Sequence, residues 1–199
     1  TLSAVPATVC SGGGTKIYLN VSGGTGPYNV TIQTSQGQST TRSMNNGDFV
    51  DLAPIGVGVL NVFISSGTDA NGCSLDVTNS NVTVTGIKPN VNQPPPQVVC
   101  NGAATTLITF TGSVPGTVYN WTNSNATIGL TAGGTGDITS FTAINTGTTP
   151  VVATITVTPS YINGATTCTG TAKSFTITVN PTPTITCPAN ITVTTTTGQ

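Results

Sequence analysis

The chain has 199 residues, of which 5% are charged, and its four basic and five acidic residues leave a formal net charge of −1. Globular proteins carry about 25% charged residues, so this surface is polar without being ionic. It has no basic patch to neutralise phosphates, which argues against nucleic-acid binding. No apolar run approaches the roughly 20 residues of a membrane-spanning helix, so we expect no membrane insertion by this segment.

Residues in the first half of the chain alternate between apolar and polar, which predicts β-strands. One apolar face is expected to hold Ile17, Leu19 and Val21. After the turn GGTGP, the same pattern returns at Tyr28, Val30 and Ile32, and GVLNVFISS follows from Gly58. Threonine is abundant, and its branched side chain favours strands while its hydroxyl keeps the outer face wetted.

The second half of the chain repeats this alternation. Tyr119 and Trp121 flank Asn120, a long strand is expected around VVATITVT, and SFTITV closes the series. No segment of useful length has the period of a helix. The sequence therefore predicts an all-β protein.

Four of the five cysteines divide the chain into two similar halves. Cys10 and Cys100 open the matching stretches CSGGGTKIYLNVSG and CNGAATTLITFTG, while Cys73 and Cys168 each follow an Asn-Gly turn. A period of about ninety residues indicates two tandem domains of one type. Short strands between Asn-Gly and Gly-Pro turns favour an immunoglobulin-like β-sandwich for each.

We therefore expect a first sandwich over 1–88, a proline-rich linker over 89–97, a second sandwich over 98–182 and the start of a further domain over 183–199. Prolines at NQPPPQ and NPTPT are expected to stiffen the joints and keep neighbouring sheets apart. No signal peptide precedes Thr1, so we interpret the chain as a fragment or a mature segment.

The repeat suggests the disulfides Cys10–Cys73 and Cys100–Cys168, with Cys187 unpaired in this segment. Such bonds would stabilise small sandwiches and belong to an oxidising compartment. The pairing has a geometric requirement: if the first cysteine ends the first strand, it lies at the opposite pole from the last hairpin. It would have to lie instead near the start of a strand beside the final one.

The motifs QVVCNGAATT, VPGTVYNWTN, VATITVTPS and FTITVNPTPT resemble PKD-like immunoglobulin-type domains of giant Bacteroidota surface proteins. The stretches CSGGG, VSGGTGPYNV and TDANGC are similar to SprB-type repeats of gliding adhesins, although the middle region here is longer. ITCPANITV resembles the opening strand of a hyalin-repeat (HYR) domain.

This resemblance implies a segment of a large filamentous adhesin, exported by the type IX secretion system and displayed on the cell surface, with a role in gliding motility. The segment would be a stiff spacer that contacts neighbouring repeats and, weakly, surfaces or polysaccharides. Two alternatives stay open: a carbohydrate- or protein-binding module of a secreted enzyme, and a self-associating fibre subunit.

Catalytic chemistry finds little support in the sequence. The chain has no histidine, so a nucleophilic triad would lack its usual base, and we expect no enzyme, cofactor or metal site. Asp48 and Asp51 are the nearest pair of acids and are interpreted as turn and strand-end residues. Asp69 in TDANG is a weak calcium candidate beside a hairpin-turn interpretation, and SGGTGPY lacks the lysine and helix of a phosphate loop. Trp121 is the candidate ligand contact of a binding module, against a role in the core.

Overall fold

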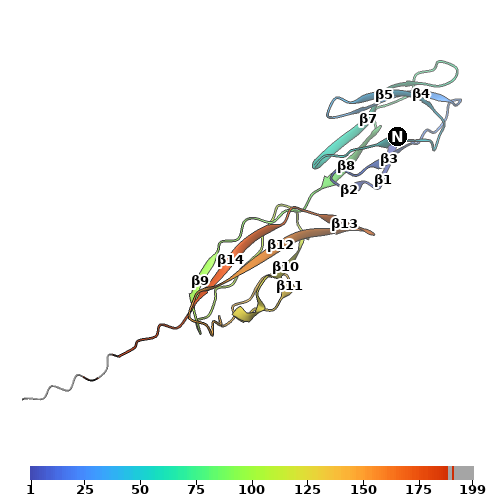
Figure 1. Ribbon diagram of the computed structural model, residues 1–199. Coiled ribbons are helices and arrows are strands. Elements are labelled where there is room, and N and C mark those ends of the chain that lie inside the picture. The colour runs from blue at the N-terminus through green and yellow to red at the C-terminus, as the bar shows by residue number, and fades with distance from the viewer. Residues whose placement is uncertain (188–189, 191–199) are drawn as a thin grey trace, which may run out of the picture.

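The computed structural model describes residues 1–187 and 190 of the chain, and it confirms the all-β fold class. Strands assemble into two layered, immunoglobulin-like units that follow one another along the chain (Figure 1). Each unit has a hydrophobic core of its own, and neither core includes residues of the other unit.

The N-terminal unit is built from two sheets. The first has the order β1-β3-β6 and the second the order β2-β8-β7-β4-β5. Its strands are β1 (Leu2–Val5), β2 (Thr8–Cys10), β3 (Thr15–Leu19), β4 (Tyr28–Thr34), β5 (Ser39–Met44), β6 (Phe49–Leu52), β7 (Gly58–Thr68) and β8 (Asn81–Ile87). The chain thus crosses from one sheet to the other between β1 and β2, and β2 then runs parallel to β8.

The C-terminal unit has one main sheet of order β11-β10-β12-β14-β9, and β13 pairs with the far end of β12. Its elements are β9 (Gln97–Cys100), β10 (Val118–Asn123), the 3₁₀ turn η1 (Ala126–Ile128), β11 (Gly133–Thr135), β12 (Val151–Asn163), β13 (Thr166–Thr169) and β14 (Lys173–Asn180). Residues 103–110 and 138–144 form the opposite layer, joined through the bridges Ala104–Thr142 and Ile108–Ile138.

The predicted alternation produces both cores. In β4, Tyr28, Val30 and Ile32 are buried, and the residues between them face outward. In β14, Phe175, Ile177 and Val179 do the same. A strand with one buried face needs this period of two, which is why the sequence pattern predicts the burial correctly.

Residues 89–97 lie against the C-terminal unit along most of their length. Val91 is buried in that unit's core, and the amide of Asn92 donates to the carbonyl of Thr111 at 2.8 Å. The side chain of Gln93 donates to the carbonyl of Ser174 at 2.9 Å. The proline-rich stretch is therefore anchored to the second unit.

Candidate functional site: the junction between the two units

The junction is formed by a long hairpin of the C-terminal unit. β12 and β13 reach beyond the end of the main sheet toward β2 and contact it (Figure 1). Cys168 on β13 pairs with Tyr161 on β12, which fixes its position near the tip. The hairpin therefore carries a cysteine to the end of the neighbouring unit.

A disulfide joins the units there, between Cys10 and Cys168, with the two Cα atoms 5.2 Å apart. The predicted pairs Cys10–Cys73 and Cys100–Cys168 are thus wrong. Cys73, Cys100 and Cys187 are exposed free cysteines within the described residues.

Strand direction explains the correction. Cys10 ends β2, which runs parallel to β8, so it lies where β8 leaves the unit, opposite Ile87. Cys73 follows β7, which is antiparallel to β8, and so it lies at the opposite pole. The geometric requirement for an internal bond is not met, because a disulfide needs Cα atoms within about 7 Å.

Other contacts support the covalent bond. The side-chain amide of Asn163, at the hairpin tip, donates to the carbonyl of Thr8 at 2.7 Å. Gly170 lies so close to the connecting chain that a Cβ there would be 1.8 Å from the carbonyl oxygen of Pro89. The junction is thus fixed by a disulfide, a hydrogen bond and close backbone packing.

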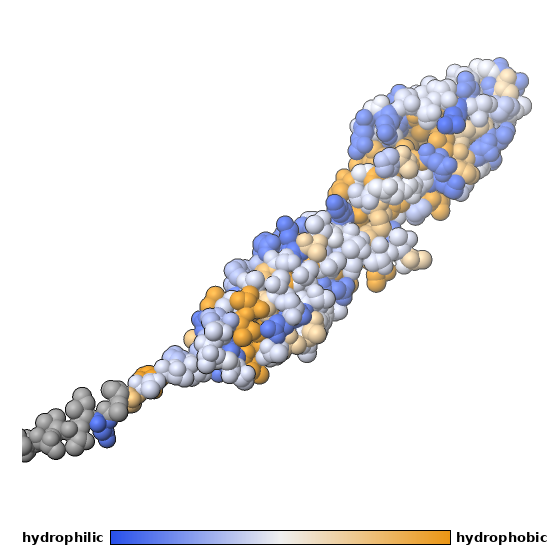
Figure 2. All heavy atoms as spheres, viewed as in Figure 1, coloured by the Kyte–Doolittle hydropathy of each residue, from blue (hydrophilic) through white to orange (hydrophobic). Residues whose placement is uncertain are grey.

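The surface around the junction is partly apolar. Figure 2 shows hydrophobic residues gathered at the end of the N-terminal unit that faces its neighbour. Val59, 63% exposed, lies at that end, because its strand partner Thr85 also pairs with Thr8 beside the disulfide.

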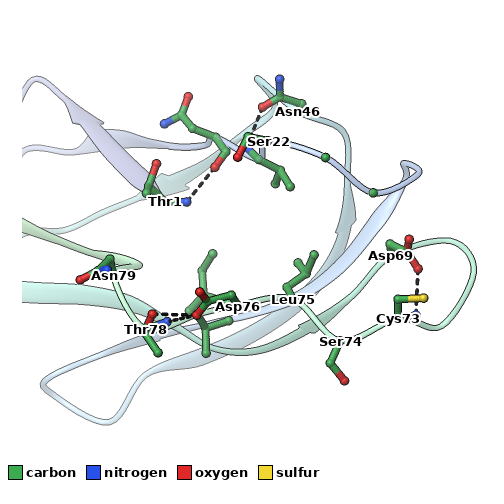
Figure 3. Close-up of a pocket in the computed structure, with 16 residues that line it drawn as sticks. Thr1, Ser22, Asn46, Asp69, Cys73, Ser74, Leu75, Asp76, Thr78 and Asn79 are labelled. Carbon is green, nitrogen blue, oxygen red and sulfur yellow. Dashed lines mark hydrogen bonds between the residues drawn. The ribbon is translucent and has the colours of Figure 1, made fainter.

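A cleft of about 840 Å³ opens at the other pole of the N-terminal unit, bordered by Thr1, Asp69, Cys73 and Asp76 (Figure 3). Here the amino terminus of Thr1 donates to the carbonyl of Asn20 at 2.7 Å. The cleft is polar and open, and its two acids are engaged in local turns.

Asp69 organises the hairpin at this pole. Its carboxylate accepts hydrogen bonds from the amides of Asn71 at 2.9 Å, Cys73 at 2.8 Å and Thr25 at 3.2 Å. The amides of Cys73, Thr25 and Asn71 hold the pKa of Asp69 below its usual value, against the opposing effect of burial. Because both oxygens accept from amides, the hairpin-turn interpretation of TDANG accounts for this acid.

Asp76 has a similar local role. It accepts from both the amide and the hydroxyl of Thr78, at 3.0 Å and 2.7 Å, and these bonds hold its pKa below the usual value. The carboxylate therefore shapes the loop before β8.

Asp48 and Asp51 do not act together. Asp48 accepts from the amide of Asn45 at 2.7 Å, which closes a turn. Asp51 forms an exposed ion pair with Lys16 at 3.2 Å, and the same ammonium lies 3.4 Å from the centre of the Phe49 ring. The structure therefore gives each carboxylate a separate structural partner.

Trp121 lies in the core of the C-terminal unit and is 7% exposed. Its indole Nε1 donates to the carbonyl of Gly136 at 3.1 Å. A Cβ on Gly134 would be 2.5 Å from the ring, so glycine there leaves room for the indole. The ring face of Trp121 is thus not available to a sugar.

The neighbouring residue Tyr119 is half-buried. Its burial, and to a smaller extent the negative charge of Asp137, raise the pKa of its hydroxyl.

The part of the chain that the structure describes holds no group of three or more His, Cys, Asp or Glu side chains placed to bind a metal. In the same part, no helix has the length and apolar character needed to cross a membrane.

No protein-family model matches this chain, and no curated protein matches it. Sequence reasoning missed the partners Thr8, Asn163 and Gly170, although the Asn-Gly turn beside Cys168 indicated a hairpin tip.

Proposed function

We propose that this chain is a structural and adhesive repeat segment of a large filamentous cell-surface adhesin, in which it acts as a stiff, extended spacer. One observation carries the proposal: the Cys10–Cys168 bond ties two sandwich units end to end. A spacer must resist bending at its joints, and a covalent bond beside a peptide connection gives a joint two attachment points.

The surface suits such a role. Charged residues make up 5% of the chain, so contacts with surfaces or polysaccharides would depend little on salt. The disulfide favours an oxidising compartment, which agrees with an extracellular location. The family resemblance described above adds export by the type IX system and gliding motility to this proposal.

Small-angle X-ray scattering tests the spacer role. A compact protein of this length has a radius of gyration of about 16 Å. We expect a clearly larger value and an elongated distance distribution for the oxidised protein. Cys10→Ser is expected to broaden the distribution by allowing the units to bend, while Cys73→Ser leaves it unchanged. A compact particle would refute the rod.

A further inference from the structure

The disulfide at the junction raises the question of what the exposed Cys100 and Cys73 do. Each has a counterpart in the other unit, and both counterparts belong to the Cys10–Cys168 bond. The main sheets of the two units can be compared position by position, because the strand orders β2-β8-β7-β4-β5 and β9-β14-β12-β10-β11 place corresponding strands side by side.

Cys100 occupies the same structural position as Cys10. Cys10 ends the edge strand β2 and lies opposite Ile87 of the parallel strand β8. Cys100 ends the edge strand β9 and lies opposite Asn180 of the parallel strand β14. The match extends along both strands. Two residues before Ile87, Thr85 pairs with Thr8 on one side and with Val59 of β7 on the other. Two residues before Asn180, Thr178 likewise pairs with Val98 on one side and with Val152 of β12 on the other.

The turns that follow these two cysteines are also the same. The amide of Ser11 donates to Ile87 and that of Asn101 to Asn180, each at 2.8 Å. The carbonyl of each cysteine accepts from the amide three residues on, and the glycine between has a φ near +85° in both turns: Gly12 at 88° and Gly102 at 81°. Cys100 is therefore presented at the far end of its unit as Cys10 is at the junction.

Cys73 corresponds to Cys168 in the same register. Nine residues separate Val152 from Tyr161, the strand partner of Cys168. Directly after β7, the residue that partners Cys73 is Asp69, whose amide donates to the carbonyl of Cys73. Asp69 lies ten positions after Val59, and the additional position is Ser65, the extra residue of a bulge. With the bulge removed, both cysteines take the same place in the hairpin.

A third opening cysteine occurs in the sequence. Cys10, Cys100 and Cys187 each follow a proline by four residues, in PATVC, PQVVC and PTITC. The spacing between successive cysteines of this kind is close to constant, so Pro183–Cys187 has the sequence of the opening strand of a further repeat.

We propose that Cys100 and Cys73 are half-sites of further repeat-to-repeat disulfides: Cys100 bonds the hairpin cysteine of the repeat that opens at Pro183, and Cys73 bonds the opening cysteine of a preceding repeat. The rule is that the opening cysteine of one repeat bonds the hairpin cysteine of the next. This inference rests on the proposed rod function and specifies how the rod is held together.

Each bond forms from two thiols. The two sulfur atoms join while two protons and two electrons leave, and a disulfide oxidant accepts them and becomes two thiols. Cys100 and Cys73 are exposed, so both are accessible to the oxidant and to a docking repeat.

Non-reducing peptide mapping of the full-length protein, with free thiols blocked at lysis, tests the inference. Cleavage before aspartate and after lysine or arginine places all five cysteines on different peptides. The Cys10–Cys168 bond is the internal control. We expect Cys100 to be joined to a cysteine outside residues 1–199 that closely follows an Asn-Gly turn, and Cys73 to one in a proline-x-x-x-Cys segment.

A free Cys100 or Cys73 beside an intact Cys10–Cys168 bond would overturn the inference, as would a bond from Cys100 to Cys73, to Cys187 or to a small thiol. These results would leave the proposed spacer function standing, because small-angle scattering tests it separately. A protein in which all five cysteines are free thiols would overturn both the repeat-to-repeat disulfides and the proposed spacer function. In Cys100→Ser, the external hairpin cysteine should become a blocked free thiol, whereas Cys187→Ser should leave the Cys100 linkage unchanged.

Discussion

Asp69 is a largely buried carboxylate, 8% exposed, whose backbone partners make it sensitive to acid. Its pKa lies below the ordinary value of 3.8 because the folded hairpin donates amides to the charged form. A lowered pKa means that the stabilising effect is complete above pH 3.8 and is lost as the pH falls through the lower, folded-state value. The hairpin bearing Cys73 should therefore loosen only in strong acid.

Asp69→Asn tests this dependence. The substitution removes the charge and one acceptor, so we expect a lower midpoint of thermal unfolding at pH 7 and a difference from the native protein that shrinks steadily below pH 3.8. Asp51→Asn is the control, because an exposed ion pair contributes little. Circular dichroism melts across pH 2–7 measure both, and a difference that grows in acid would contradict the assignment.

Trp121 contributes to the stability of the core. Trp121→Ala should lower the free energy of unfolding of the C-terminal unit by about 3–5 kcal/mol. Trp121→Phe, which loses the bond to Gly136, should cost about 1–2 kcal/mol. Urea denaturation followed by far-UV circular dichroism measures both losses. Tryptophan fluorescence cannot be used, because Trp121 is the chain's one tryptophan and both substitutions remove it. A stable Trp121→Ala protein that had lost binding to a glycan would instead favour the binding-module hypothesis.

At the scale of elements, the segment before β9 depends on close approach to the turn between β13 and β14. Gly170→Ala places a Cβ 1.8 Å from the carbonyl oxygen of Pro89, and neither backbone can move freely. We expect a loss of about 1–3 kcal/mol from overpacking and faster proteolysis around Val91. Gly147→Ala is the matched control, because its nearest neighbour would be at 3.4 Å. Equal effects of the two substitutions would show that residues 89–91 are not held at this contact.

The strands were predictable from sequence because a half-buried strand imposes a local period of two, as in Tyr28, Val30 and Ile32. The partner of Cys10 was not, because it depends on which way β2 runs and on a hairpin in the other unit. Repeat spacing indicated that the cysteines were equivalent between halves. It could not distinguish a bond within a repeat from a bond to the next one, since both preserve the same period.

At the scale of the whole molecule, the position of the disulfide determines how unfolding is distributed. If the N-terminal unit unfolds alone, the bond closes a loop from Cys10 to the junction; if the C-terminal unit unfolds alone, it closes one from the junction to Cys168. Each loop has roughly 80 residues, which the chain-entropy model converts to about 4.5 kcal/mol. One bond between units therefore stabilises both, whereas Cys10–Cys73 would have stabilised only the first.

Differential scanning calorimetry can separate these arrangements. Cys10→Ser and Cys168→Ser should each lower both unfolding transitions, by about 15 °C or more if a small unit shifts 4–8 °C per kcal/mol. Cys73→Ser should leave both transitions in place, because Cys73 has no disulfide in this chain. A shift confined to the first transition, matched by Cys73→Ser, would mean that Cys10 bonds within its own unit. A fall in both transitions would show that one disulfide, between Cys10 and Cys168, stabilises both units.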